Sequence, residues 1–159
     1  MDLRLYHNSH EFYYRSSFGA VPSGSRLILR LRASGSDAQN CRARIRLWQI
    51  NVGESFVPMS YEDGIFTGIV TIPPKGCLLW YYFIIDDGHR TFYYGNNYDR
   101  LGGEGAKYPD VPPAYQVTVY DKDAHTPDWF KHAIVYQIFP DRFRHGTHTS
   151  GRLYGKKGA

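Results

Sequence analysis

The amino-acid sequence predicts an all-β protein, an antiparallel β-sandwich, over most of its 159 residues. Apolar and polar residues alternate with a period of two in several short segments, as they do in strands with one buried face. Turn residues separate these segments, and the chain carries 16 glycines and 9 prolines. No long helical pattern interrupts the strands, and a composition of 42% hydrophobic residues is enough to build a packed core.

The first two predicted strands, residues 25–33 and 41–50, each have an apolar face and a basic face. The residues of the first strand that share the apolar face are Leu27, Leu29 and Leu31, opposite Arg26, Arg30 and Arg32. In the second strand the two faces consist of Cys41, Ala43, Ile45 and Leu47, and of Arg42, Arg44, Arg46 and Trp48. Arginines seldom point into a core, so the face that carries Trp48 is predicted to be the outer one.

The next strands are predicted at residues 64–72, 78–86, 89–94 and 114–120, with a long loop between residues 95 and 113. Asp87-Gly88 is a signal for a two-residue hairpin turn. Such a turn places Asp86 opposite His89, Phe83 opposite Phe92 and Tyr82 opposite Tyr93. The faces of this hairpin then carry Tyr81, Phe83, Ile85, Phe92 and Tyr94 on one side, and Trp80, Tyr82, Ile84, Thr91 and Tyr93 on the other.

Short strands at this spacing, with turns between them, are typical of an immunoglobulin-like sandwich. The pattern changes after residue 120, where a polar linker leads to the almost wholly apolar run at residues 133–139. Such a run is typical of a strand buried on both faces of a parallel sheet. It needs parallel neighbours, each reached by a crossover of a dozen or more residues. We therefore predict a sandwich module at residues 1–124, and a linker with the first strand of a truncated (β/α)8 barrel at residues 125–159.

A known family has a similar barrel start. Residues 127–130 (Pro-Asp-Trp-Phe) and 134–143 (Ile-Val-Tyr-Gln-Ile-Phe-Pro-Asp-Arg-Phe) resemble the beginning of the catalytic barrel in the α-amylase family, glycoside hydrolase family 13. They look most like the neopullulanase, cyclomaltodextrinase and maltogenic amylase branch, in which an N-terminal β-sandwich comes first and in many members is a carbohydrate-binding module. Residues 81–83 and 93–95 are also similar to that module.

The resemblance implies a parent enzyme that hydrolyses α-glycosidic bonds of starch-like or cyclodextrin substrates. The family uses two carboxylates in a retaining mechanism. Its catalytic groups lie at the ends of later barrel strands, and a whole barrel takes about 250 residues. No catalytic residue is therefore assigned within this sequence, and the 159 residues by themselves are expected to be non-catalytic.

Asp141 is a candidate substrate-binding residue on the basis of the same resemblance. It follows the first barrel strand, at the end where barrel active sites form. The alternative is that Asp141 and Arg142 pair with each other or with a neighbouring strand. Some relatives bind calcium in the next loop, but residues 144–148 contain no carboxylate, and calcium prefers oxygen ligands. We predict no metal site and no cofactor.

Trp48 is the first candidate for contact with sugar within the sandwich. Sugar rings bind to flat, exposed aromatic side chains flanked by hydrogen-bonding groups. An outward tryptophan beside arginines also suits a contact with the catalytic barrel or with a second subunit. Local packing in the sheet is the third interpretation.

The outward residues Trp80, Tyr82 and Tyr93 are the second candidate, with stabilisation of the sheet as the alternative. The glycine-rich loop at residues 95–105 is the third. In the neopullulanase-like branch that the sequence resembles, N-terminal modules help to form dimers and narrow the mouth of the partner's active site. This loop is therefore interpreted either as such a dimer contact or as a solvated linker. The expected partners are an α-glucan or maltooligosaccharide, the catalytic barrel and a second copy of the chain.

The remaining sequence features exclude other classes. The net charge of +4 includes six arginines between residues 26 and 46, but no nucleic-acid motif accompanies them, so nucleic-acid binding is not expected. No apolar run approaches a membrane span. The first ten residues lack the apolar region of a signal peptide, which favours a cytoplasmic location. Cys41 and Cys77 are interpreted as small buried hydrophobic residues, or as a pair.

Overall fold

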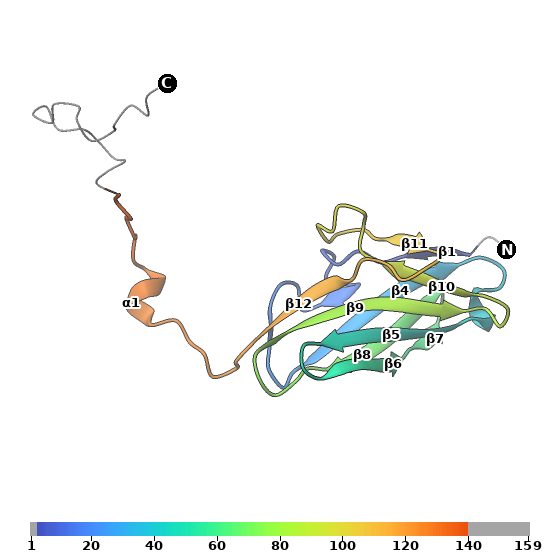
Figure 1. Ribbon diagram of the computed structural model, residues 1–159, viewed down its shortest axis with the longest axis horizontal. Helices are drawn as coiled ribbons and strands as arrows, with labels where there is room; N and C mark the ends of the chain where they lie inside the picture. Colours follow the sequence, from blue (N-terminus) through green and yellow to red (C-terminus); the bar gives the residue numbers. More distant parts are fainter. Residues whose placement is uncertain (1–2, 140–159) are drawn as a thin grey trace, which may run out of the picture. The chain divides into compact units, whose positions relative to one another are not determined.

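The computed structural model describes residues 3–139 and confirms an all-β protein of two packed sheets (Figure 1). The chain divides into two compact units, Met1–Ala124 and His125–Ala159. The first unit contains every strand found among the described residues, and the second contains one short helix, α1 (Asp128–Lys131). The assignment of these units as a sandwich module and a barrel start stays a prediction.

The smaller sheet is antiparallel and has the strand order β1-β4-β8-β7, with β2 paired to β4 beside β1. Its strands are β1 (Arg4–Tyr6), β2 (Arg15–Ser16), β4 (Arg26–Ser34), β7 (Ser60–Glu62) and β8 (Ile65–Thr71). The long pairing of β4 with β8 runs from Arg26 opposite Thr71 to Arg32 opposite Ile65.

The larger sheet is arranged around β9, which pairs with β5 on one side and with both β10 and β12 on the other. Its strands are β3 (Val21–Pro22), β5 (Arg42–Gln49), β6 (Gly53–Pro58), β9 (Cys77–Asp86), β10 (Thr91–Gly95), β11 (Ala106–Tyr108) and β12 (Tyr115–Tyr120). The short β3 runs parallel to β12, and the other pairs are antiparallel. A 3-10 helix, Ala38–Asn40, precedes β5.

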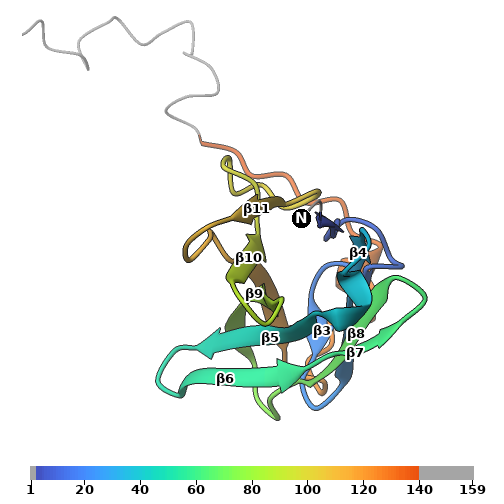
Figure 2. The same cartoon turned by 90° about the vertical axis from the view of Figure 1, so that its right-hand side faces the viewer.

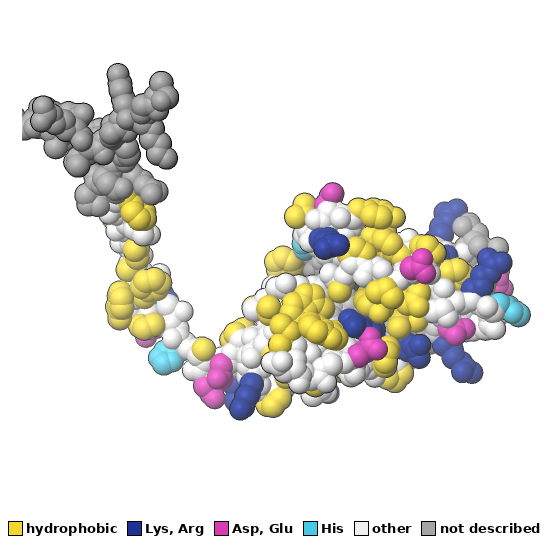
Figure 3. Space-filling view, viewed as in Figure 1, with side chains coloured by type: hydrophobic (Ala, Val, Ile, Leu, Met, Phe, Trp, Pro, Cys, Tyr) yellow, Lys and Arg dark blue, Asp and Glu magenta, His cyan; other side chains and the backbone are white. Residues whose placement is uncertain are grey.

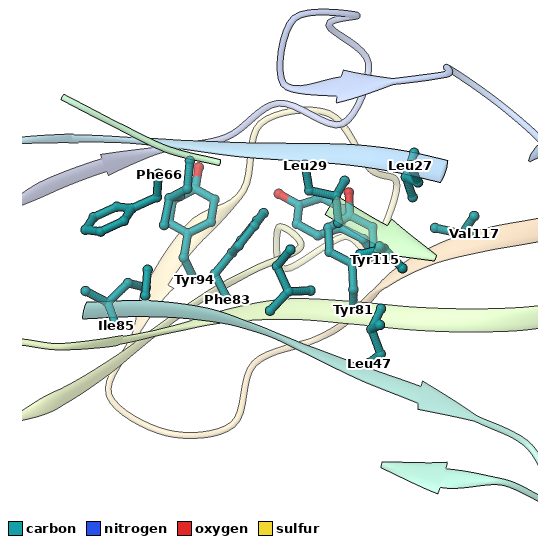
Figure 4. Packing of buried hydrophobic residues seen from close by; sticks show 14 of the residues in the cluster. Leu27, Leu29, Leu47, Phe66, Tyr81, Phe83, Ile85, Tyr94, Tyr115 and Val117 are labelled. Carbon is teal, nitrogen blue, oxygen red and sulfur yellow. The ribbon is translucent and has the colours of Figure 1, made fainter. Parts of the chain in front are cut away.

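The core lies between the two sheets, with β9 and β10 on one side and β4 and β8 on the other (Figure 2). It contains several aromatic side chains, since Tyr81, Phe83, Tyr94 and Tyr115 point from the larger sheet toward Leu29 and its neighbours (Figure 4). The period-two prediction is confirmed by the buried residues of the first two predicted strands, namely Leu27, Leu29, Leu31, Cys41, Ala43, Ile45 and Leu47.

Both cysteines are free thiols. Cys41 is buried in the core, and burial raises the pKa of its thiol. Cys77 is half-buried at the start of β9, and burial raises its pKa as well. Of the two interpretations from the sequence, the small buried hydrophobic residue therefore fits Cys41, and the disulfide pair is wrong.

The predicted hairpin register is wrong by two residues. In the structure Thr91 lies opposite Asp86, and Phe92 lies opposite Ile85, so four residues form the connection. Asp87 holds it, because its Oδ1 accepts hydrogen bonds from the backbone N–H groups of His89 and Arg90. These bonds also lower the pKa of the Asp87 carboxyl group. A shift of two residues keeps every side chain on its predicted face.

The predicted loop at residues 95–113 is more ordered than expected. It contains β11, which pairs with β10. Asn96 is buried, and its Oδ1 accepts hydrogen bonds from the N–H groups of Asn97 and Gly102. Tyr108 donates a hydrogen bond to the Asn96 carbonyl oxygen at 2.7 Å. Side-chain hydrogen bonds thus fix a segment whose composition indicates only turns.

Residues 133–139, predicted to be the first barrel strand, have no regular secondary structure, and Ile134 and Tyr136 are exposed. A strand of a parallel sheet has no hydrogen-bond partners without its neighbours. The barrel-start assignment therefore stays a prediction. Asp141, Arg142 and residues 144–148 lie outside the described residues.

Gly105 is expected to tolerate no side chain. A Cβ atom added there would lie 2.1 Å from both the Gly95 carbonyl oxygen and the Tyr115 hydroxyl. Because the first of these atoms is backbone, Gly105→Ala should lower the free energy of unfolding by about 1–3 kcal/mol, as overpacking does. Urea denaturation measures this change. Gly68→Ala is the comparison, since its added Cβ meets the flexible end of Ile45; an equal or smaller loss for Gly105→Ala would contradict the argument.

Candidate functional site

The outer face of the larger sheet brings the two tryptophans of the sequence analysis into contact. The register of β5 and β9 places Trp48 directly opposite Trp80. Their ring centroids are 5.1 Å apart, and the ring planes make an angle of 57°. Both side chains are half-buried. Two candidates that the sequence presents separately therefore form one pair.

The two tyrosine candidates lie further along the same face. The rings of Tyr82 on β9 and Tyr93 on β10 meet edge to face, with centroids 6.1 Å apart. Tyr82 is buried, and burial raises the pKa of its phenol, while the positive charge of Arg46 opposes that rise. We call the set Trp48, Trp80, Tyr82 and Tyr93 the aromatic surface. Figure 3 shows hydrophobic side chains gathered over β5 and β9 on this face.

Arginines from β5 lie over one ring of the aromatic surface, Tyr82, and over a neighbouring ring, Phe56. The guanidinium carbon of Arg46 is 5.2 Å from the centroid of the Tyr82 ring, and that of Arg44 is 5.0 Å from the Phe56 ring. Arg46 Nε also donates to Glu54 Oε1 at 2.5 Å. Tyr82 is therefore covered by Arg46, so it supports the surface from beneath.

Strand β6 supplies two residues that the sequence analysis missed, Glu54 and Phe56. They lie opposite Trp48 and Arg46 respectively. Phe56 remains 48% exposed, which extends the apolar area beyond the aromatic surface. Residues 53–58 (Gly-Glu-Ser-Phe-Val-Pro) show no apolar–polar alternation, and Gly, Glu and Pro are depleted in strands, so the sequence carries no signal for β6.

A pocket of about 680 Å³ opens beside Trp80. Loops from the N-terminal segment and from residues 96–102 form its walls, together with the outer face of β12. The pocket shares Trp80 with the aromatic surface, so the two are continuous. Among the residues that line it are Arg15, Phe18, Ala20, Trp80, Arg100 and Gln116.

The region combines aromatic rings with hydrogen-bond donors. Flat half-exposed rings with guanidinium and amide donors beside them suit the apolar faces and hydroxyl edges of sugar rings. Within residues 3–139, no group of three or more His, Cys, Asp and Glu side chains is placed to hold a metal ion. Among those residues, no helix is long and apolar enough to cross a membrane.

Fold and surface together define a β-sandwich module with an aromatic outer face. Comparison with curated proteins then finds amylopullulanases. The chain is 40% identical over 153 residues to the amylopullulanase of Thermoanaerobacterium thermosulfurigenes, a match that covers 89% of this chain and 8% of that protein.

Two further amylopullulanases match in the same way. That of Thermoanaerobacterium saccharolyticum is 40% identical over 152 residues, covering 89% of this chain and 12% of that protein. That of Thermoanaerobacter thermohydrosulfuricus is 38% identical over 162 residues, covering 96% and 10%. The chain thus spans about a tenth of the length of these relatives. No protein-family profile matches the chain.

Proposed function

We propose that the chain is a non-catalytic module of a glycoside hydrolase that cuts α-glucans. The observation that carries the proposal is the 40% identity to an amylopullulanase over 89% of the chain. The barrel-start string at residues 134–143 supports a finer assignment to the α-amylase family and its neopullulanase-like branch. In that family two carboxylates perform a retaining hydrolysis, and both belong to later strands of the barrel.

The module gives the enzyme access to its substrate by holding an α-glucan chain on the aromatic surface. Trp48 and Trp80 supply adjacent rings from two paired strands. A rigid sheet holds these rings without the loss of conformational freedom that a flexible loop would suffer on binding. Arg44, further along the same face of β5, carries N–H groups that can donate hydrogen bonds to sugar hydroxyl oxygens.

A second role for the same face is contact with the catalytic barrel or with another copy of the chain. The observation that favours it is the pairing of arginines with aromatic rings, Arg44 with Phe56 and Arg46 with Tyr82. Tryptophan, tyrosine and arginine are the residues most enriched among the anchors of protein interfaces. The two roles differ in what Trp48 contacts.

Trp48→Ala is expected to abolish binding of starch. The native 159-residue chain should be retarded in a native gel that contains soluble starch, and the variant should lose that retardation through a fall in affinity of about tenfold or more. Trp129→Ala is the matched control, because Trp129 is exposed but lies in the second unit. It should be retarded like the native chain.

The alternative outcome assigns the face to protein contact. If starch does not retard the native chain, sugar recognition belongs elsewhere in the enzyme. Sedimentation of the native chain and of Trp48→Ala, with and without the separately expressed catalytic barrel, then tests the second role. A face that binds neither starch, nor the barrel, nor a second copy would overturn both roles.

A further inference from the structure

The pocket beside Trp80 has the size and lining of a small-ligand site. Its volume of about 680 Å³ lies within the range of roughly 300–1,000 Å³ that small-molecule pockets occupy. One wall is apolar, with Trp80 on β9 and an exposed Phe18 from the N-terminal segment. The other walls are polar, with the amide of Gln116 and two guanidinium groups.

Arg15 is the distinctive residue of this pocket. It is only 7% exposed, although it carries a positive charge. Its Nη2 donates to the Gly19 carbonyl oxygen at 2.7 Å, and its Nη1 donates to the Gln116 carbonyl oxygen at 3.3 Å. Its Nε is buried and has no hydrogen-bond partner among the described residues. A guanidinium group has five N–H donors, so Arg15 keeps donors in excess of its acceptors.

The charge of the pocket is wholly one-sided. Arg15 and Arg100 line it, and none of the described residues that line it is acidic. The N–H groups of Arg15 and Arg100 lie in the same pocket as the ring of Trp80. An occupant with many hydrogen-bond acceptors and one flat apolar face fits both the donors and the aromatic wall.

We infer that this pocket binds a terminal sugar ring of an α-glucan chain, with the sugar's hydroxyl oxygens accepting hydrogen bonds from the Nη groups of Arg15 and Arg100. Trp80 belongs both to the pocket and to the aromatic surface, so the rest of the bound glucan continues across Trp48. This inference rests on the proposed binding of glucan and deepens it, because it adds an end-binding subsite to a surface that binds along the chain.

The test uses maltotriose, which is short enough to depend on the pocket. Maltotriose is titrated into the native 159-residue chain, and amide chemical shifts are followed by NMR. We expect shifts at Gly102 and Gln116, which line the pocket from the loop at residues 96–102 and from β12. Ala20→Trp, which fills the pocket from an exposed lining position, should lower the affinity for maltotriose at least tenfold.

Matched controls separate blocking from general damage. Ala124→Trp adds the same side chain at an exposed position outside the pocket. Phe18→Ala should lower the affinity for maltotriose severalfold. Phe12→Ala should leave that affinity unchanged, because Phe12 is exposed in the same segment but does not line the pocket. Dispersed amide spectra establish that each variant is folded.

The outcomes distinguish this inference from the proposed function. Suppose that Ala20→Trp binds maltotriose like the native chain while Trp48→Ala no longer binds starch. The inference about the pocket is then overturned, and glucan binding by the aromatic surface stands. If inorganic phosphate shifts Gly102 and Gln116 and maltotriose does not, the pocket binds anions, and the inference is overturned. If neither maltotriose nor starch binds, both are wrong.

Discussion

Phe83→Ala is expected to lower the free energy of unfolding by about 3–5 kcal/mol, the cost typical of removing a buried phenylalanine. Phe83 is fully buried near the middle of β9. Its ring centroid lies 4.8 Å from that of His7, 5.8 Å from that of Tyr81 and 6.4 Å from that of Tyr94. Figure 4 shows Phe83 in the core together with Tyr81 and Tyr94. Strand β9 is paired on both sides, so the surrounding rings cannot move in to fill the space.

Urea denaturation followed by fluorescence measures this loss. A domain of this size has about 5–15 kcal/mol of stability, so the variant should unfold at a far lower urea concentration with a similar slope. Ile69→Ala is the control, because Ile69 is 51% exposed on the outer face of β8 and its truncation should cost well under 1 kcal/mol. A loss below about 1 kcal/mol for Phe83→Ala would contradict the packing described for the core.

Most of the strands predicted from sequence have a clear period of two, whereas β9 was predicted from a continuous apolar and aromatic run. In β4, Leu27, Leu29 and Leu31 alternate with residues that face outward, and only a strand places such residues on opposite faces. The same argument places Trp48 on the outer face of β5. Burial of one face of a strand thus imposes the alternation of apolar and polar residues, and this alternation allows the strand to be predicted.

The shortest strands have no such pattern. β2 and β3 contain two residues each, so their positions depend on the long strands beside them, β4 and β12. The hairpin register was missed for a different reason. The side chain of Asp87 bonds to two backbone N–H groups, and this local preference wins over the two-residue turn that Asp87-Gly88 indicates.

The residues of the aromatic surface were predicted as separate candidates. The period-two alternation tells which face of a strand a residue occupies, but it does not tell which strands are neighbours. Trp48 and Trp80 are 32 positions apart, and the pairing of β5 with β9 brings them together. The pocket could not be predicted, because Arg15 and Gln116 reach it from distant segments. Strand order and loop packing are tertiary properties that hydrophobic period alone does not contain.

A second large effect on stability is expected when the pH is lowered. The free energy of unfolding should fall by about 3 kcal/mol as the pH is lowered from about 6.5 to about 4, because of His7. His7 is fully buried within the core. Its Nδ1 lies 2.7 Å from the Arg30 carbonyl oxygen, and its Nε2 lies 3.0 Å from the Tyr81 hydroxyl. Nδ1 therefore carries the proton, and Nε2 accepts a hydrogen bond from Tyr81.

Protonation would disrupt this arrangement. The imidazolium ion has no acceptor at Nε2, so the Tyr81 O–H could no longer donate to it. Burial lowers the pKa of His7 from 6.5 to about 4, and the positive charge of Arg15 adds to this effect, while the hydrogen bond to Arg30 opposes it. The unfolded chain binds a proton below pH 6.5 that the folded chain does not. Stability is therefore complete above pH 6.5 and is lost as the pH falls toward 4.

Urea denaturation at intervals between pH 7 and pH 4 measures this dependence. His7→Gln is the control, because its amide can donate to the Arg30 carbonyl oxygen and accept from Tyr81 without titrating. The variant is expected to be less stable at pH 7 and to show a flatter profile above pH 4.5, where carboxyl groups contribute little. The difference between the two profiles isolates His7 from the exposed histidines. Parallel profiles would mean that the folded chain admits the proton, and that the core around Tyr81 opens more readily than its packing indicates.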